Sequence, residues 1–168
     1  MPRWLDMPGE PAIGLLQVCR ACRQGDYAKA APDDIVITID VTNRSTEAAD
    51  CHVLPTLWFR NTWSWGDQTD KPWIKSLGPS EGAAWAVETE HAELGRYYLY
   101  GAHAADLLFT ENESNAERLW NVPAGQPFVK DAFHRHLIHG EHNAVNTNMG
   151  GTKFGAATRL TVEAGQRV

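Results

Sequence analysis

A period of two in side-chain type between residues 34 and 42, with mostly β-branched residues, constrains the fold of this chain more than any other feature of its sequence. A period of two places successive side chains on opposite faces of a strand, and β-branched residues favour strands. We therefore predict a strand with one apolar face over residues 34–42. The apolar face consists of Ile35, Ile37, Ile39 and Val41, and Val36, Thr38, Asp40 and Thr42 lie between them.

Short apolar runs separated by polar, glycine- and proline-rich links recur along the rest of the chain. A second run at residues 51–60 follows a short polar link, so we expect it to pair antiparallel with the first strand. Many short strands with polar turns favour a mainly β fold, an antiparallel, supersandwich-like β-sandwich, over a wound α/β sheet. Further strands are predicted at residues 82–88, 96–101, 106–110 and 158–163, and short helices at residues 115–120 and 128–139.

The two ends of the chain differ from its middle. Pro2, Pro8, Gly9 and Pro11 interrupt any period near the start, so we expect an irregular arm over residues 1–26 and a partial β-sandwich over residues 27–168. Near the other end, the alternation over residues 158–163 is followed by a turn and by what reads as the start of another strand. We expect a truncated sandwich whose exposed strand edges favour self-association.

Charge and composition exclude several classes of partner and compartment. The chain carries 15 Lys and Arg against 21 Asp and Glu, a net charge of −6, whereas binding to nucleic-acid duplexes or anionic membranes depends on basic residues. Its apolar runs are shorter than the roughly 18 residues that a membrane span needs. The 3 cysteines, an odd number, do not form a disulfide framework. We therefore expect a cytoplasmic protein that binds neither nucleic acid nor membranes.

An aromatic stretch at residues 54–66 is the strongest candidate for a binding surface. Exposed aromatic rings stack on sugars or bases, whereas buried ones form a core or an interface with another domain. Nucleic-acid stacking is the weakest of these interpretations, because it needs a basic groove. If the strand continued through this stretch, one face would carry Phe59, Asn61, Trp63 and Trp65, and the other would carry Trp58 and Arg60.

Histidines and cysteines supply candidate metal ligands. His136 and His139 are three residues apart and would share one face of a helix, with His134 close by. The more ordinary interpretation is a set of helix-surface histidines, because no carboxylate at a suitable spacing completes a metal triad. Cys19 and Cys22 have the spacing of a zinc or redox pair, but no second pair follows them. We expect no cofactor.

Catalytic motifs are absent from the sequence. It has no Gly-x-Ser-x-Gly, no phosphate loop and no dinucleotide fingerprint. Many carboxylates lie in predicted turns and strands, but spacing singles out none of them. They are Asp67, Asp70, Glu88, Glu90, Asp106, Glu111 and Glu113. The chain therefore carries no complete active site that we can identify.

Several separate motifs, in order, resemble one protein family. They are residues 27–30 with 33–35, 54–66, 108–113, 129–134, 138–140, 144–146 and 151–153. From Tyr27 to Val168 the chain resembles the N-terminal β-sandwich region of bacterial glycosidases similar to glycoside hydrolase family 63, the processing α-glucosidase-like group. Residues 1–26 do not share the resemblance.

The resemblance implies a role next to a catalytic domain. In that family a catalytic (α/α)₆ barrel carries the acid and base of an inverting mechanism, and no part of this chain corresponds to it. The leading hypothesis is a non-catalytic sandwich domain that packs on such a barrel and shapes access to it. A second is a freestanding carbohydrate-binding module that uses Trp63, Trp65 and Arg60. A third is a small metal-dependent enzyme that uses the histidine cluster.

Overall fold

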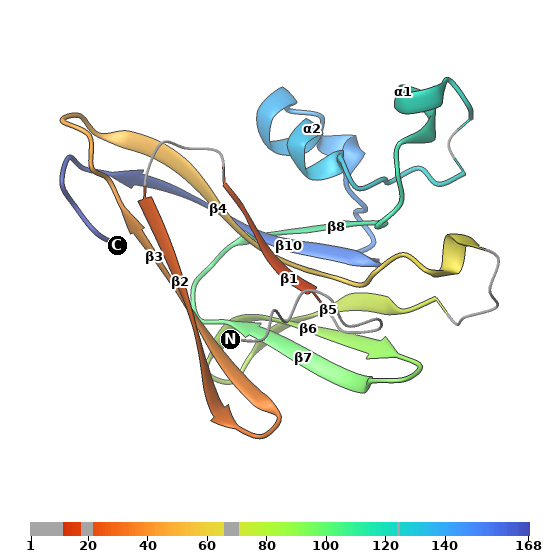
Figure 1. The fold of residues 1–168 in the computed structure, drawn as a ribbon, viewed down its shortest axis with the longest axis horizontal. Coiled ribbons are helices and arrows are strands. Elements are labelled where there is room, and N and C mark those ends of the chain that lie inside the picture. Colours follow the sequence, from red (N-terminus) through yellow and green to blue (C-terminus); the bar gives the residue numbers. More distant parts are fainter. Residues whose placement is uncertain (1–11, 18–21, 66–70, 124) are drawn as a thin grey trace. The chain divides into compact units, whose positions relative to one another are not determined.

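The chain folds mainly into antiparallel β-sheets. A computed structural model describes residues 12–17, 22–65, 71–123 and 125–168, with the side chains of residues 12–17, 22, 23 and 65 left out. The strands are β1 (Ala12–Gln17), β2 (Cys22–Ala31), β3 (Asp34–Thr42), β4 (Ala49–Trp58), β5 (Trp73–Ser80), β6 (Ala83–His91), β7 (Gly95–Gly101), β8 (Asp106–Thr110), β9 (Gly150–Gly151) and β10 (Lys153–Val162) (Figure 1). The α-helices are α1 (Ala116–Trp120) and α2 (Ala132–His139), and the 3₁₀ turns are η1 (Trp63–Trp65) and η2 (His142–Ala144).

The described strands form three sheets. The first has the order β1-β4-β10-β8, the second is the β2-β3 hairpin, and the third has the order β7-β6-β5-β9. The predicted mainly β, antiparallel fold is therefore confirmed. The chain divides into two compact units, residues 1–15 with 54–157 and residues 16–53 with 158–168, so β4 and β10 contribute to both.

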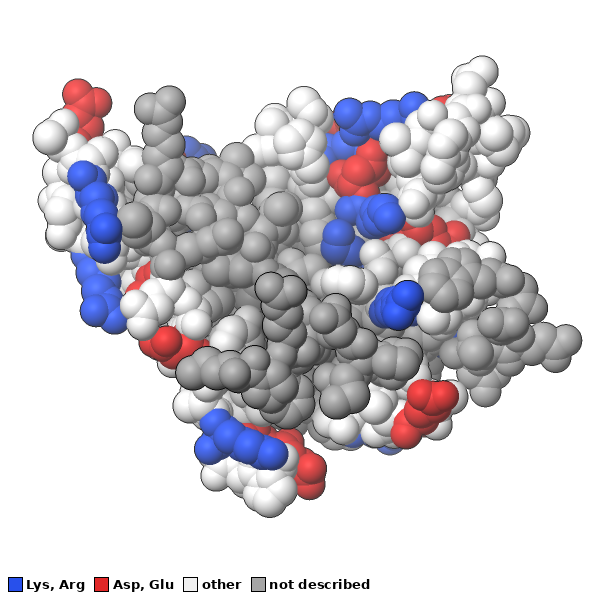
Figure 2. Space-filling view, viewed as in Figure 1, with Lys and Arg blue, Asp and Glu red and all other residues white. Residues whose placement is uncertain are grey.

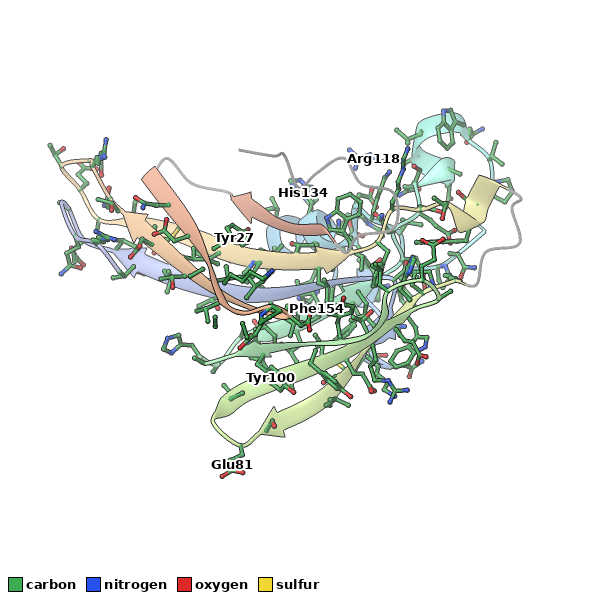
Figure 3. The ribbon with its side chains drawn as sticks, turned by 60° about the horizontal axis from the view of Figure 1, so that its bottom comes forward. Tyr27, Glu81, Tyr100, Arg118, His134 and Phe154 are labelled. Carbon is green, nitrogen blue, oxygen red and sulfur yellow. The ribbon has the colours of Figure 1, made fainter. Side chains whose placement is uncertain are left out.

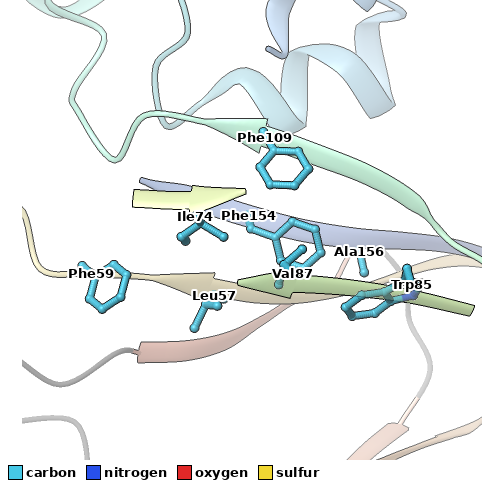
Figure 4. Packing of buried hydrophobic residues seen from close by; sticks show 8 residues of the cluster. All are labelled: Leu57, Phe59, Ile74, Trp85, Val87, Phe109, Phe154 and Ala156. Carbon is cyan, nitrogen blue, oxygen red and sulfur yellow. The ribbon is translucent and has the colours of Figure 1, made fainter. Parts of the chain in front are cut away.

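A sandwich core lies within the unit of residues 54–157. Side chains from β4, β8 and β10 on one sheet meet side chains from β5 and β6 on the other (Figure 4). Phe109 and Phe154 are fully buried, with ring centroids 5.0 Å apart, and Phe154 also packs on Trp85. Burial of aromatic rings contributes much of the stability of a core. Two packed antiparallel sheets are the predicted sandwich.

The first sheet is covered on its other face by α2 and η2. Leu54, Leu108 and Ala157 point to this side and pack with Phe133 of α2 and with Val145. Strand residues alternate between the two layers, because Leu108 faces the helix while the next residue in the chain faces the sandwich core. This alternation gives unit 54–157 three layers, which are helix α2, the first sheet and the third sheet.

The second unit is built around the hairpin of β2 and β3. Its register pairs Tyr27 with Ile37 and Lys29 with Ile35, so one face of the hairpin carries the apolar residues that the alternation predicted. At the base of the hairpin, Val41 packs with Cys51 and Val162. The strand predicted at residues 34–42 is thus confirmed, whereas its distal residues remain exposed.

The predicted pairing of β3 with the run that follows it is wrong. β3 pairs with β2, and its last residues bond to the chain end, with Val41 N donating to Val168 O and Asn43 N donating to Gln166 O. The cause lies in the link, where buried Asn43 donates through Nδ2 to Glu47 O and Val162 O, each at 2.8 Å. These bonds turn the chain so that β4 joins β10 instead.

Other expected elements agree in part. The strands predicted at 82–88, 96–101 and 106–110 appear as β6, β7 and β8, and both helices form. β5 was not predicted, because residues 77–80 read as a turn, and its register shifts at Gly78. β1 and part of β2 lie where an irregular arm was expected. Neither described helix has the length and hydrophobicity that crossing a membrane demands.

Candidate functional site

The aromatic stretch does not continue as a strand. β4 ends at Trp58, which is half-buried, and Arg60 beyond it is exposed. Asn61 and Trp63 are both half-buried, and Trp63 begins the turn η1. The backbone of Trp65 belongs to η1, but its side chain lies outside the described residues. The predicted alternation of faces over residues 58–65 is therefore wrong.

Side-chain amides explain why the strand stops. Asn112 Nδ2 donates to Phe59 O at 2.7 Å, and Asn61 Nδ2 donates to Asn112 O at 3.0 Å. Asn61 Oδ1 also accepts from Ser64 N at 3.2 Å, which closes the turn. Asn side chains compete in this way with sheet hydrogen bonds. Segments 59–65 and 111–113 are consequently held together by reciprocal amide contacts.

Two carboxylates and one ammonium lie beside this junction. Lys71 Nζ is 2.9 Å from Glu111 Oε2 and 3.5 Å from Glu113 Oε1. Thr152 Oγ1 donates to Glu111 Oε2 at 2.8 Å, and the indole N–H of Trp63 donates to Glu113 Oε1 at 3.2 Å. We call these residues, Trp63, Lys71, Glu111, Glu113 and Thr152, the Trp63–Glu113 cluster.

The cluster is anchored by the elements around it. Asn112 N donates to Thr152 Oγ1 at 2.8 Å, and Lys130 N donates to Glu113 O at 2.9 Å. Asn115 then caps α1, accepting from Arg118 N at 3.0 Å. The loop after β8 therefore has its backbone fixed at several points, so its carboxylates are positioned before any partner arrives.

The cluster is accessible at its outer edge. The side chains of Glu111 and Glu113 are 17% and 23% exposed, and that of Lys71 is 37% exposed. The carboxylate oxygens of Glu111 and Glu113 accept hydrogen bonds, and the ammonium of Lys71 donates them. The N–H edge of the Trp63 indole lies beside the carboxylate of Glu113. Such groups suit the positioning of a hydroxyl-rich molecule or of a neighbouring domain.

A second polar group borders the cluster at the start of α2. Asp131 accepts from Asn115 Nδ2 at 3.1 Å and from Arg118 Nη1 at 3.3 Å. On the described part of the face in Figure 2, acidic and basic side chains are interspersed.

The histidines pair differently from the expectation. The rings of His134 and His139 are 5.1 Å apart, and those of His136 and His142 are 5.2 Å apart, both edge to face. The predicted pair of His136 and His139 is thus divided between two contacts, because α2 ends at His139 and the chain turns back at Gly140. Among the described residues, no three His, Cys, Asp or Glu side chains gather as metal ligands do. Cys19 lies outside the described residues, as does the side chain of Cys22.

Sequence reasoning named Trp63, Glu111 and Glu113 but did not connect them. It did not name Lys71, and it included Thr152 only within the motif at residues 151–153, whereas the structure shows that these two residues bridge and orient the two carboxylates. A usable signal was present, because two glutamates two residues apart follow directly on the buried strand β8. Polar residues at the end of a buried strand lie where loops carry functional groups.

Comparison with known proteins gives a similarity to part of a much longer chain. An uncharacterized protein of Saccharomyces cerevisiae, YMR196W, is 29% identical over 147 residues, an alignment that covers 73% of this chain. This chain spans only 13% of the length of that protein. No protein-family model and no solved structure matches the chain.

Proposed function

We propose that this chain is a non-catalytic β-sandwich domain of a glycosidase-like protein, and that it docks on a catalytic (α/α)₆ barrel and shapes access to it. The observation that carries the proposal is the Trp63–Glu113 cluster. It holds two carboxylates, an ammonium and an indole in fixed positions at one partly exposed site. Preorganised polar and aromatic groups of this kind favour binding, because little conformational entropy is lost when a partner arrives.

The domain hypothesis has two further supports. The motifs of residues 54–66 and 108–113, which carry the resemblance to family 63-like glycosidases, are the segments that meet in the cluster. The yeast relative is also far longer than the region of similarity, as a multidomain protein would be. The proposal includes a cytosolic setting, since the 3 cysteines give no disulfide framework.

Docking by this cluster gives each group a role. The half-buried ring of Trp63 supplies apolar contact area, and tryptophan is frequent among the residues that dominate interfaces. Glu111 and Glu113 accept hydrogen bonds from the barrel or from a sugar at its entrance. Lys71 keeps the two carboxylates together and limits their mutual repulsion. Neither carboxylate is assigned a catalytic role.

The test is association with a separately produced barrel. The purified chain is mixed with the (α/α)₆ barrel of a bacterial family 63-like glycosidase, and the mass of the mixture is measured by light scattering during size-exclusion chromatography. We expect an equimolar complex, and no hydrolysis of 4-nitrophenyl α-glucoside by the chain alone. Lys71→Glu should weaken the complex by about tenfold or more, because it places three carboxylates together.

A control variant separates docking from general damage. Tyr100→Ala changes an exposed residue of β7 outside the cluster and should leave the complex intact. If the folded chain and the barrel elute separately at every ratio, the docking role is wrong. Hydrolysis by the chain alone would contradict its non-catalytic character. Stoichiometric zinc, iron or manganese in the purified chain would instead favour the metal-enzyme alternative.

A further inference from the structure

The outer face of the sheet formed by β7, β6, β5 and β9 carries an ordered set of aromatic and charged side chains. The register places Tyr98 opposite Glu88, and Glu88 opposite Lys75. Two residues further along β6, Glu90 is opposite Arg96 on one side and opposite Trp73 on the other. Directly opposed residues of antiparallel strands point to the same side of a sheet. The face opposite Val87 and Trp85, which lie in the core, therefore carries this set, with Lys75, Arg96 and Glu90 accessible and Glu88 buried beneath them.

Two tyrosines form an exposed platform on this face. The rings of Tyr98 and Tyr100 stack with centroids 6.2 Å apart and an interplanar angle of 23°. They remain 47% and 54% exposed, and Ala86, paired with Tyr100, is fully buried. Tyr100 stands on β7 in Figure 3. Tyrosine offers a large rigid contact area at a small cost in side-chain entropy.

The charged groups next to the platform are paired with one another. Glu88 lies 2.9 Å from Lys75 Nζ and 3.3 Å from Arg96 Nη1, and it accepts a hydrogen bond of 3.2 Å from the hydroxyl of Tyr98. Arg96 Nη2 also donates to Glu90 at 3.2 Å. Two cations and two anions thus neutralise one another, and the hydroxyl of one platform ring belongs to the same network.

This arrangement determines the chemistry of a suitable ligand. A charged ligand would have to displace internal ion pairs, so the face favours an uncharged one. The core of a protein–protein interface is depleted of charged residues, whereas here four charged side chains lie on the same face as the aromatic rings. Hydroxyl groups both donate and accept, and can bond to the cations and carboxylates without adding charge. The exposed ring faces add contact area for C–H groups.

We propose that the face made by Tyr98, Tyr100, Lys75, Glu88 and Arg96 binds a neutral polysaccharide chain. The rings of Tyr98 and Tyr100 stack on successive sugar units, and the exposed members of the network, Lys75, Arg96 and Glu90, bond to their hydroxyls. This function goes beyond docking on a barrel and uses none of the residues of the Trp63–Glu113 cluster. It would keep the chain, and any domain attached to it, on its polymeric ligand.

Affinity electrophoresis of the full chain tests the proposal. Native gels contain glycogen, a mixed-linkage β-glucan or a galactomannan, with polygalacturonate as an anionic comparison. We expect at least one neutral polysaccharide to retard the chain, and polygalacturonate to retard it less. Tyr100→Ala should raise the apparent dissociation constant roughly fivefold or more, since a ring contact is lost. Tyr100→Phe should keep most of the binding, because it keeps the ring.

A matched control is another exposed tyrosine. Tyr27 on β2 is 58% exposed, and Tyr27→Ala should leave the retardation unchanged. A second measurement needs no variant. Oligosaccharides prepared from the polysaccharide that retards the chain are added to the wild-type chain, and its amide chemical shifts are followed. The largest shifts should fall on residues 95–101 and 86–90.

Three results would overturn the proposal. The first is no retardation by any of the three neutral polysaccharides, the second is equal retardation of wild type and Tyr100→Ala, and the third is a set of amide shifts confined to strands other than β5, β6 and β7. Failure of the docking role is a separate outcome. The Lys71→Glu variant tests association with the barrel, and the Tyr100→Ala variant tests retardation by polysaccharides.

Discussion

The indole N–H of Trp63 donates a hydrogen bond of 3.2 Å to Oε1 of Glu113, a residue 50 positions further along the chain. The same oxygen lies 3.5 Å from Lys71 Nζ. A tryptophan that could have been an open stacking platform is therefore a structural partner of a carboxylate. Its orientation is set by that bond, and the position of the loop after β8 depends on it in turn.

Trp63→Phe tests the contribution of this bond to stability. The substitution keeps an aromatic ring but removes the donor to Glu113, so we expect the free energy of unfolding to fall by about 1–2 kcal/mol. Urea denaturation followed by circular dichroism measures the change. Trp120→Phe is the control, since Trp120 is 63% exposed on α1 and should change stability by less than about 0.5 kcal/mol. Equal losses in the two variants would contradict a structural role for the Trp63 bond.

Asn112→Ala tests the junction between segments 59–65 and 111–113. Asn112 Nδ2 donates to Phe59 O at 2.7 Å, and without it this carbonyl loses its partner at the end of β4. An unsatisfied buried acceptor costs about 1–3 kcal/mol, which should appear in the unfolding free energy. The exposed Asn148 provides the comparison, and Asn148→Ala should have a much smaller effect. If Asn112→Ala is as stable as wild type, the amide contacts do not hold the junction.

Adjacent glycines in β9 give a prediction with a built-in control. A Cβ on Gly151 would collide with the backbone oxygen of Thr110, whereas one on Gly150 would lie 3.6 Å from Ile74 O, an ordinary contact. Gly151→Ala should therefore lose about 1–3 kcal/mol of unfolding free energy, because backbone cannot move aside as a side chain can. Gly150→Ala should be nearly neutral. Thermal unfolding of both variants decides the matter, and the reverse order would show that β8 and β9 do not approach as described.

The strands with regular alternation were predictable, and those shaped by side-chain bonds were not. Residues 34–42 form the predicted strand because their β-branched side chains favour an extended backbone, and residues 106–110 form theirs as a short apolar run whose last three residues are buried. β5 was missed because Gly78 and Pro79 indicate a turn, and the strand forms through its pairing with β6, which tolerates a shifted register at Gly78. Pairing of β3 with β4 failed as a prediction because one buried side chain, Asn43, redirects the link.

The candidate site was predictable only in its parts. Trp63 and Glu113 were each candidate site residues in the sequence. The hydrogen bond between them joins segments that are far apart in the chain, and no periodicity of the sequence predicts such a contact. Lys71 lies outside every motif, and only the fold brings its ammonium between two carboxylates. The tyrosines of β7 were included in a predicted strand, but their shared face with Glu88 required the register of three strands.

The pH dependence of stability should reveal the network around Glu88. The hydrogen bond from Lys75 is the main cause that lowers the pKa of Glu88 below its usual value, and Tyr98 and Arg96 add to it while partial burial opposes it. A carboxyl group with a lowered pKa in the folded state contributes stability above its unfolded pKa, near 4.3 for glutamate. That contribution is lost as the pH falls through the lower, folded-state pKa.

Glu88→Gln should therefore be less stable than wild type at pH 7, and the difference should shrink as the pH falls below about 4. Urea denaturation of both proteins across this range measures the difference, with Glu81→Gln as the control. Glu81 lies exposed in the turn between β5 and β6, as Figure 3 shows, and its replacement should leave stability nearly unchanged at each pH. A difference between wild type and Glu88→Gln that stays constant with pH would mean that the ion pairs of Glu88 do not stabilise the folded chain. The face proposed to bind polysaccharide would then lack the fixed network on which the proposed recognition of hydroxyls depends.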